Sequence, residues 1–449
     1  MKTLDTNDMP MTDSRRALLK KALFGAGMWG LRSLATGIPV SVLMNPRSAL
    51  AQSCTPVSKA QYLIFATSGN GDPMNGNVPG TYINDPNVLH PADPTMTATN
   101  MSIGGTTYKA AAPWATLAPA TVARTCFFHH GTYTVVHPDE KKVLSLMGAT
   151  NGSEMLVSLL ASQLAGQLCT IQKEPVSVAA AGASETIFYQ GRPQPMLTPV
   201  SLATILTAPS GPLYNLQTYR DADLNRLNDF FKTNGNKSQK DFIDRYATSQ
   251  TQVRAVGQTL MSQLASLTDN TPDSQITAAV VLFQMNVTPV VTVHIPFGGD
   301  NHTDTGLATE SAQHVAALAT INNMMTKINA APGMADKISF MAMNVFGRTM
   351  SAAHKTDGRD HHGDHHCSIM IGSGFKGSVI GGIESANNDY RAQSIDSTTG
   401  QGVAAGAGDV KFADTMGSMG KTLGMALGVD KTFLDTNIMQ GTVIQPALV

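Results

Sequence analysis

Short apolar segments alternate with longer segments of helical periodicity along this chain, and that alternation constrains the fold more than any other feature of the sequence. The apolar segments read as buried strands at 62–66, 122–128, 176–180, 289–295, 337–343 and 367–371. The helical patterns lie at 154–168, 274–284, 311–330 and 411–427. Such alternation predicts an α/β fold with a mostly parallel sheet and helices on both of its faces.

One long polar segment interrupts this alternation. Residues 221–267 have helical periodicity and are broken at Asn234-Gly-Asn-Lys237, which predicts a helical hairpin. We expect it to be an insertion or a cap at about 215–270. The remainder of 52–449 is long enough for one large α/β domain, and two equal domains are not required.

The first 51 residues resemble a twin-arginine export signal. Ser14-Arg-Arg-Ala-Leu-Leu-Lys20 precedes an apolar stretch diluted by glycine, and Ala49-Leu-Ala51 supplies small residues before a cut at Gln52. We therefore expect a periplasmic or secreted protein whose signal is removed and whose export partner is the twin-arginine translocase. Because Cys54 follows no convincing lipobox, no stable membrane anchor is expected. The alternative is that the paired arginines are ordinary juxtamembrane positive charges.

Bulk charge excludes one class of partner. Lys plus Arg number 31 against 32 for Asp plus Glu, the net charge is −1, and no basic stripe is visible, so we expect no nucleic-acid partner. The four cysteines, at 54, 126, 169 and 367, form no CxxC pair and are expected to be mostly packed thiols. Cys367 adjoins a histidine cluster and has a second possible role as a soft metal ligand.

That histidine cluster spans 354–366 and indicates a metal site. It holds five of the chain's twelve histidines, with Asp357, Asp360, Asp364 and Arg359 among them. Neutral imidazole and carboxylate oxygen bind divalent zinc, manganese or iron. The spacing suits a helix, with His361 and His365 at i and i+4, or a tight loop at Gly358 and Gly363. The competing interpretation is a solvated polar loop.

Further candidate ligands follow the predicted strands. Ligands in open α/β sheets sit beyond the carboxyl ends of the strands. The candidates, taken strand by strand, are Asp72; His129, His130 and His137; Asp300 and His302; and Arg348. Drawn from distant loops to one sheet edge, such residues can assemble a hydrolytic site with one or two metals. His294 and His314 are expected to be packing residues instead.

A family resemblance enters at the C-terminal motifs. Asn344-Val-Phe-Gly-Arg-Thr349 and Gly358-Arg-Asp-His361, followed by Ile371-Gly-Ser-Gly-Phe-Lys-Gly377 and Val379-Ile-Gly-Gly-Ile383, resemble the signature of a bacterial twin-arginine-exported family, the domain of unknown function numbered 1501. Gly299-Asp-Asn-His302 resembles the family's Asp-Thr-His element. The resemblance implies a three-layer α/β/α sandwich like alkaline phosphatases and sulfatases. It also implies metal ligands at Asp300, His302, Asp360 and His361.

The chain departs from that family pattern at two positions. Val345 stands where the family usually has a glutamate, and His362 stands where it usually has an aromatic residue. The lost carboxylate implies a changed metal, a compensating ligand such as Asp364, His365 or His366, or a site without activity. Asp72 and His365 complete the set of candidate ligands.

If the site is catalytic, the residues predict metal-assisted displacement at a phosphate or sulfate ester. The cofactor would be a divalent metal, zinc first, with manganese, iron or calcium as alternatives. Arg348 or Arg359 would clamp the non-bridging oxygens, or would form structural ion pairs. Thr132 or Thr134 would be the nucleophile, or a water molecule activated by the metal would replace them.

Two other classes of function fit the same residues. The chain could be an exported binding or scaffold protein that keeps a hydrolase fold without turnover, or a metal-sequestering protein. A shared fold alone does not establish a shared activity. As a hydrolase, its substrate would be a small-molecule ester or a surface polymer.

Overall fold

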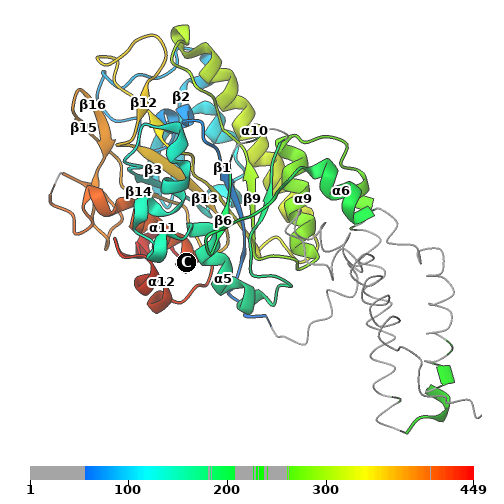
Figure 1. Ribbon diagram of the computed structural model, residues 1–449. Helices are drawn as coiled ribbons and strands as arrows, with labels where there is room; N and C mark the ends of the chain where they lie inside the picture. Colours follow the sequence, from blue (N-terminus) through cyan, green and yellow to red (C-terminus); the bar gives the residue numbers. More distant parts are fainter. Residues whose placement is uncertain are drawn as a thin grey trace, which may run out of the picture.

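The computed structural model describes residues 56–449 except 181–182, 184, 405 and most of 208–261 (Figure 1). The expected export signal at 1–51 lies outside the described residues. The expected helical hairpin at 221–267 also falls largely outside them. The fold described below is that of the remaining chain.

The core is an eight-stranded sheet in the order β14-β4-β13-β10-β1-β9-β5-β8. Its strands are β1 (Tyr62–Thr67), β4 (Thr125–His130), β5 (Val176–Val178), β8 (Met196–Leu197), β9 (Val290–His294), β10 (Ile338–Ala342), β13 (His366–Ile371) and β14 (Ser378–Ile380). Within this sheet β13 is antiparallel to both of its neighbours, and the other described pairings are parallel. A mixed α/β fold with a mostly parallel sheet is therefore confirmed.

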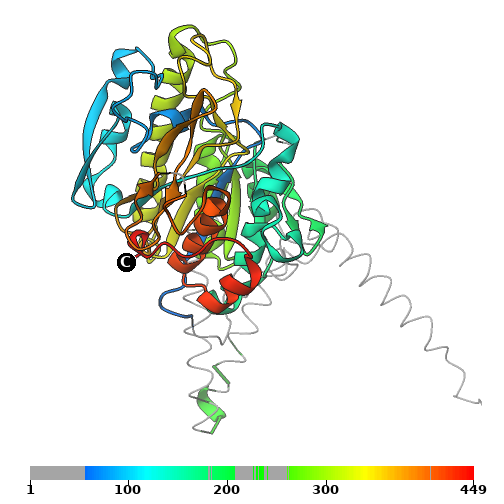
Figure 2. The same cartoon turned by 90° about the vertical axis from the view of Figure 1, so that its left-hand side faces the viewer.

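Helices cover both faces of the sheet. The helices are α3 (Pro119–Val122), α4 (Glu140–Leu144), α5 (Leu156–Leu168), α6 (Pro199–Thr207), α9 (Pro272–Gln284), α10 (Ala308–Ala330), α11 (Thr415–Ala426) and α12 (Lys431–Asn437). The connection through α5 crosses the sheet in the opposite direction to the one through α10, so right-handed crossovers put these helices on opposite faces. Figures 1 and 2 show α10 on one side of the sheet and α11 on the other.

Small two-stranded sheets lie outside this central sheet. They are β2 (Ala98–Ile103) with β3 (Thr106–Ala111), β6 (Phe188–Tyr189) with β7 (Arg192–Pro193), β11 (Gly347–Arg348) with β12 (His361–His362), β15 (Ile383–Ala386) with β16 (Asp389–Ala392), and β17 (Ser394–Ile395) with β18 (Gly402–Val403). The β2–β3 hairpin projects from one edge of the molecule in Figure 2. The β11–β12 pair matters most here, because it carries part of the candidate site.

The structure corrects three local expectations. The strand expected at 122–128 begins at Thr125, because Pro119 starts a short helix that includes Val122. The closing helix expected at 411–427 begins at Thr415. Cys126 and Cys367 are buried free thiols, but Cys169 is disulfide-bonded, so the expectation of packed thiols was wrong for Cys169.

The reversed strand β13 explains how the histidine cluster reaches the sheet edge. Because β13 runs against its neighbours, its first residue lies beside the last residue of β4, with His366 opposite His130. The residues before β13 are therefore delivered to the edge where the parallel strands end. This segment is extended at β12, so the helical alternative for His361 and His365 was wrong.

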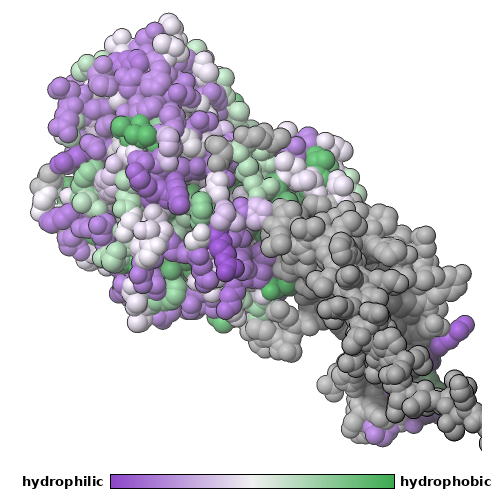
Figure 3. Space-filling model, in the orientation of Figure 1, coloured by the Kyte–Doolittle hydropathy of each residue, from purple (hydrophilic) through white to green (hydrophobic). Residues whose placement is uncertain are grey.

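The surface of the described chain is mostly polar on the face that Figure 3 shows, with small apolar areas scattered over it. Among the described residues, no helix combines the length and the apolar character needed to cross a bilayer.

Candidate metal centre

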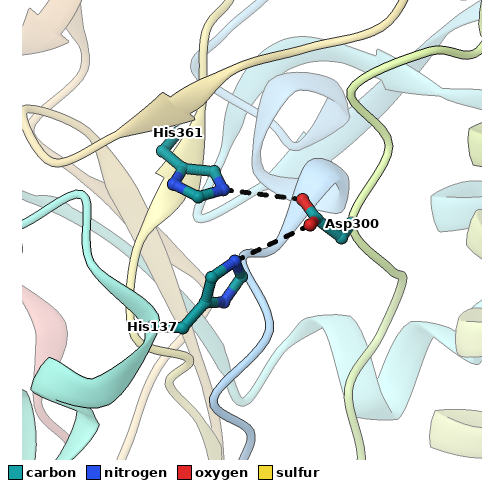
Figure 4. Close-up of side chains that lie close together, drawn as sticks. All are labelled: His137, Asp300 and His361. Atoms are coloured by element: carbon teal, nitrogen blue, oxygen red, sulfur yellow. Dashed lines mark ion pairs between the residues drawn. The ribbon is translucent and has the colours of Figure 1, made fainter.

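Three side chains from segments distant in the sequence converge at the carboxyl edge of the sheet. Among the described residues, His137, Asp300 and His361 place one ligand atom each within 4.8 Å of the others. Asp300 Oδ2 is 3.7 Å from His137 Nε2, and Asp300 Oδ1 is 3.5 Å from His361 Nε2. Figure 4 shows both rings directed at the carboxylate, which lies between them.

Backbone carbonyls fix the orientation of the two imidazoles. His137 Nδ1 lies 2.7 Å from the carbonyl oxygen of Gly69, and His361 Nδ1 lies 2.7 Å from that of Val135. A carbonyl oxygen only accepts, so each Nδ1 must donate its proton. The Nε2 lone pairs then face Asp300 in the neutral rings, as in histidines that bind metals.

His302 lies beside two of these three residues, Asp300 and His361. Its Nδ1 is 2.9 Å from Asp360 Oδ1, and its Nε2 is 3.1 Å from Asp300 Oδ1 and 2.9 Å from His361 Nε2. With both Nδ1 atoms donating, two Nε2 lone pairs would face each other at 2.9 Å. That contact is repulsive unless a proton or a cation lies between the rings.

The donor set fits a divalent metal ion. Three imidazole nitrogens and one carboxylate oxygen are ligands that zinc accepts in a tetrahedral site. Metal–ligand bonds of about 2.0–2.1 Å would place tetrahedral ligand atoms roughly 3.3 Å apart. Four separations are 2.9–3.7 Å: Asp300 Oδ2 to His137 Nε2, Asp300 Oδ1 to the Nε2 atoms of His361 and His302, and His302 Nε2 to His361 Nε2.

Nearby charges keep these donors in their metal-binding forms. Burial alone would raise the pKa of Asp300, but the hydrogen bond and charge of Arg348, at 2.8 Å, bring it below its ordinary value. Lys355 and then His302 lower the pKa of Asp360 to about 2. Burial, followed by the charge of Arg348, lowers the pKa of His361. At neutral pH the carboxylates are ionised and His361 is neutral.

Arg348 contacts Asp300 from the protein interior and is not exposed to solvent at the candidate centre. Its side chain is fully buried and donates to Asp300 and, at 3.4 Å, to the carbonyl of Gly299. A buried guanidinium cannot clamp a substrate without a conformational change. The geometry therefore fits the second role considered for Arg348, an ion pair that positions Asp300.

Arg359 lies outside the centre. Its guanidinium is buried against Glu310, with nitrogen–oxygen distances of 2.7 and 3.0 Å, and it also donates to the carbonyls of Thr349 and Leu89. These bonds leave it no free face toward the donors. Arg359 therefore forms a structural ion pair with Glu310, and its predicted role in binding the ester oxygens is not supported by this geometry.

Asp72 and His365 are also held elsewhere. Asp72 caps a short 3₁₀ helix by accepting from the Met74 amide at 2.8 Å, and burial raises its pKa to about 8. His365 is buried with its Nε2 2.9 Å from His129 Nδ1. Neither belongs to the cluster, which corrects both assignments.

Neither candidate threonine contacts the donor atoms. Thr132 is buried and its hydroxyl donates to the carbonyl of Gly363 at 3.4 Å. The Thr134 hydroxyl donates to Asp139 at 2.8 Å. The nucleophile assignment to either threonine therefore has no geometric support, and a water molecule remains the alternative.

A cleft of about 840 Å³ opens beside the centre. His137 and Asp300 form part of its wall, together with Glu140, Glu185 and His294. His137 was among the candidate ligands after the second strand but was left out of the final ligand set, and His294 was expected to be a packing residue. The shared sheet edge was the available signal for both.

Comparisons of the chain with models of known protein families and with curated proteins find no match. The candidate centre is therefore interpreted from its own geometry.

Proposed function

We propose that this chain is an exported, metal-dependent hydrolase that acts on phosphate or sulfate esters. The observation that carries the proposal is the convergence of the Nε2 atoms of His137, His302 and His361 on Asp300. A cation at this point would supply Lewis-acid activation of the ester oxygen. Zinc is the first choice from the donor set, and manganese, iron and calcium are the alternatives.

Residues around the centre orient its ligands and give the substrate access to it. Asp360 orients His302 by accepting a hydrogen bond from the Nδ1 atom of His302, and the buried Arg348 orients Asp300 through their ion pair. The adjoining cleft gives a substrate direct access to Asp300 and His137. Its volume accommodates a small-molecule ester or the terminal group of a surface polymer.

The family assignment is part of this proposal. The motif Phe346-Gly-Arg348 enters β11, and Asp360-His361 enters β12 directly opposite it. Both motifs thus belong to the candidate centre, as the resemblance to the domain of unknown function numbered 1501 implies. Under this proposal the mostly parallel sheet with helices on both faces is an alkaline-phosphatase-like or sulfatase-like sandwich.

Export through the twin-arginine route also belongs to the proposal. Structural disulfides persist in oxidising compartments such as the bacterial periplasm. The disulfide at Cys169 therefore supports a periplasmic or secreted location, together with the paired arginines Arg15 and Arg16.

The first test is the metal content of the exported protein, with His361→Ala beside His362→Ala. These histidines are sequence neighbours on β12, but His362 Nε2 lies 2.6 Å from the carbonyl oxygen of Tyr390 and outside the donor set. We expect stoichiometric metal in the wild type and in His362→Ala, and its loss in His361→Ala. Aryl phosphates and aryl sulfates then test turnover. Metal-free wild type, or equal metal in both variants, would overturn the metal centre.

Two observations favour a second candidate, an exported binding or scaffold protein. Neither threonine hydroxyl reaches the centre, and Arg348 is buried. A protein that binds stoichiometric metal yet hydrolyses none of the aryl esters would match this alternative.

A further inference from the structure

A histidine–carboxylate pair lies in the cleft beyond the candidate metal centre. His294 ends β9, and its Nδ1 is 2.8 Å from Glu185 Oε2. Both residues line the cleft that also exposes His137 and Asp300. A carboxylate at Nδ1 is the arrangement that orients a histidine for proton transfer at Nε2.

Glu185 is held in place by the glycine-rich loop after β1. Its Oε1 accepts from the amide of Gly69 at 3.0 Å, and its side chain is only 7% exposed. Burial opposes ionisation, but the contact with His294 and the bond from Gly69 bring the pKa of Glu185 below its ordinary value. The pair therefore contains an ionised carboxylate at neutral pH.

The pair is not aligned as a structural hydrogen bond. Glu185 Oε2 and His294 Nδ1 are close, yet neither atom completes a well-directed bond. Buried polar atoms are normally paired, and exceptions concentrate where function requires them. In structures without substrate, catalytic hydrogen bonds are often misaligned and tighten when substrate binds.

The outer nitrogen of His294 is available to a substrate. The described residues offer its Nε2 no hydrogen-bond partner, while its backbone amide is fixed by Gln275 Oε1 at 2.8 Å. Glu140 lies on the same wall, where burial and the charge of Glu185 raise its pKa to about 7. The wall thus places the carboxylate of Glu185 and the carboxyl group of Glu140 beside His294.

We propose that His294, oriented by Glu185, is the general acid that protonates the leaving group of the ester. This inference rests on the proposed hydrolase function. The oxygen of an attacking water forms the new bond to phosphorus or sulfur, and the bond to the leaving-group oxygen breaks. That oxygen takes a proton from His294 Nε2, water releases one proton to solvent, and His294 regains one from solvent.

The test compares two aryl esters that differ in leaving group. Phenyl phosphate releases the more basic oxyanion and needs a general acid more than 4-nitrophenyl phosphate does; the matching sulfates serve if sulfate is preferred. We expect His294→Gln to lower kcat for the phenyl ester by about 10²–10⁴-fold. The loss on the nitrophenyl ester should be at least about tenfold smaller, since its leaving group departs without a proton.

Glu185→Gln tests the positioning role and serves if His294→Gln fails to fold. It keeps the side-chain size, and we expect the same leaving-group dependence with a smaller loss. Glu384→Gln is the matched control, because Glu384 pairs with Arg391 on the β15–β16 hairpin outside the cleft. We expect it to leave both rates unchanged.

The outcomes distinguish failure of the general-acid role from failure of the hydrolase function. An active wild type whose variants lose equal activity on both esters would overturn the general-acid role alone. A wild type that hydrolyses neither ester, with metal bound, would overturn the hydrolase function and this inference with it.

Discussion

At the scale of single residues, the tautomer of each histidine decides whether the centre can bind a metal. Two of the relevant contacts are to backbone carbonyls, those of Gly69 and Val135, and the third is to Asp360. Such partners free Nε2 and raise the basicity of the ligand. The metal affinity of the centre therefore depends on residues that never touch the metal.

Asp360→Asn should weaken metal binding without abolishing it. An amide at position 360 is a weaker acceptor than a carboxylate for His302 Nδ1, and loss of such a partner typically reduces affinity by about 10–100-fold. Competition with a chromogenic chelator measures the change. Asp357→Asn is the control, because Asp357 is exposed in the same loop. Equal affinities for the two variants would count against the orienting role of Asp360.

Arg359→Met should destabilise the fold strongly. It leaves Glu310 buried without its ion-pair partner, and breaking a buried pair from one side costs about 3–5 kcal/mol. Denaturant unfolding measures the loss. Asp336→Asn breaks the exposed pair with Arg124 and should cost less than about 1 kcal/mol. Similar losses in the two variants would contradict a structural role for Arg359.

The sequence predicted part of the candidate centre. Asp300, His302, Asp360 and His361 were all selected, and the structure brings them together. His137 was named among the candidates but left out of the final ligand set, because its position depends on how the loop after β4 folds back over Gly69. Burial of Asp72 is likewise a tertiary property, which the sequence pattern alone does not show.

At the scale of elements, the direction of β13 could not be read from the sequence. An apolar strand has the same composition in either direction, whereas the end at which its loop emerges depends on pairing with β4 and β10. The β2–β3 hairpin was missed because its strands are largely exposed and lack a long apolar run. The buried strands β1, β9 and β10 were predicted well, because burial on both faces produces continuous apolar runs.

The loop that follows β12 is docked on the loop that follows β4, and Gly363 is the contact between them. Its carbonyl accepts from the amides of Thr132 and Tyr133, each at 2.8 Å. A Cβ at position 363 would collide with the backbone of Thr134. Since Val135 in this loop orients His361, the contact links packing to the candidate centre.

Gly363→Ala should therefore lower both stability and metal affinity. Forcing an extra methyl group into a packed contact costs about 1–3 kcal/mol. Thermal unfolding and chelator competition measure the two effects on one preparation. Gly166→Ala is the control, because it lies within α5, where an added Cβ meets no atom of the described residues within 4 Å beyond the helix's own backbone, and alanine should stabilise a helix by about 0.5–1 kcal/mol. A Gly363→Ala protein with unchanged metal affinity would show that the two loops are not coupled.

At the scale of the whole molecule, buried histidines link folding to pH. Burial lowers the pKa of His90 and His314 to about 3 and of His129 and His130 to about 4. It lowers the pKa of His365 and His366 well below the ordinary value. As pH falls, each of these histidines takes up a proton in the unfolded chain at about pH 6.5, before it does so in the folded chain. Their contribution to stability is complete above that pH and is lost as pH falls.

Two buried carboxyls act in the opposite direction. The pKa is raised to about 8 for Asp72 and to about 7 for Glu140, in both cases by burial first. The folded chain keeps these protons after the unfolded chain has released them at about pH 4. Each carboxyl therefore reduces stability as pH rises from about 4 toward its pKa in the folded state.

The balance of these groups predicts a stability maximum between about pH 6.5 and 7 in protein freed of metal with a chelator. Below it the six histidines outnumber the two carboxyls, and each fully titrating histidine removes up to about 1.4 kcal/mol per pH unit. Above it only the carboxyls still titrate in this range. His314→Leu sharpens the test, because neither His314 nitrogen has a hydrogen-bond partner and leucine removes one acid-sensitive group. Denaturant unfolding at pH 5, 6, 7 and 8 should give a shallower acid slope for this variant. Equal slopes for variant and wild type would show that His314 takes up its proton without unfolding the protein.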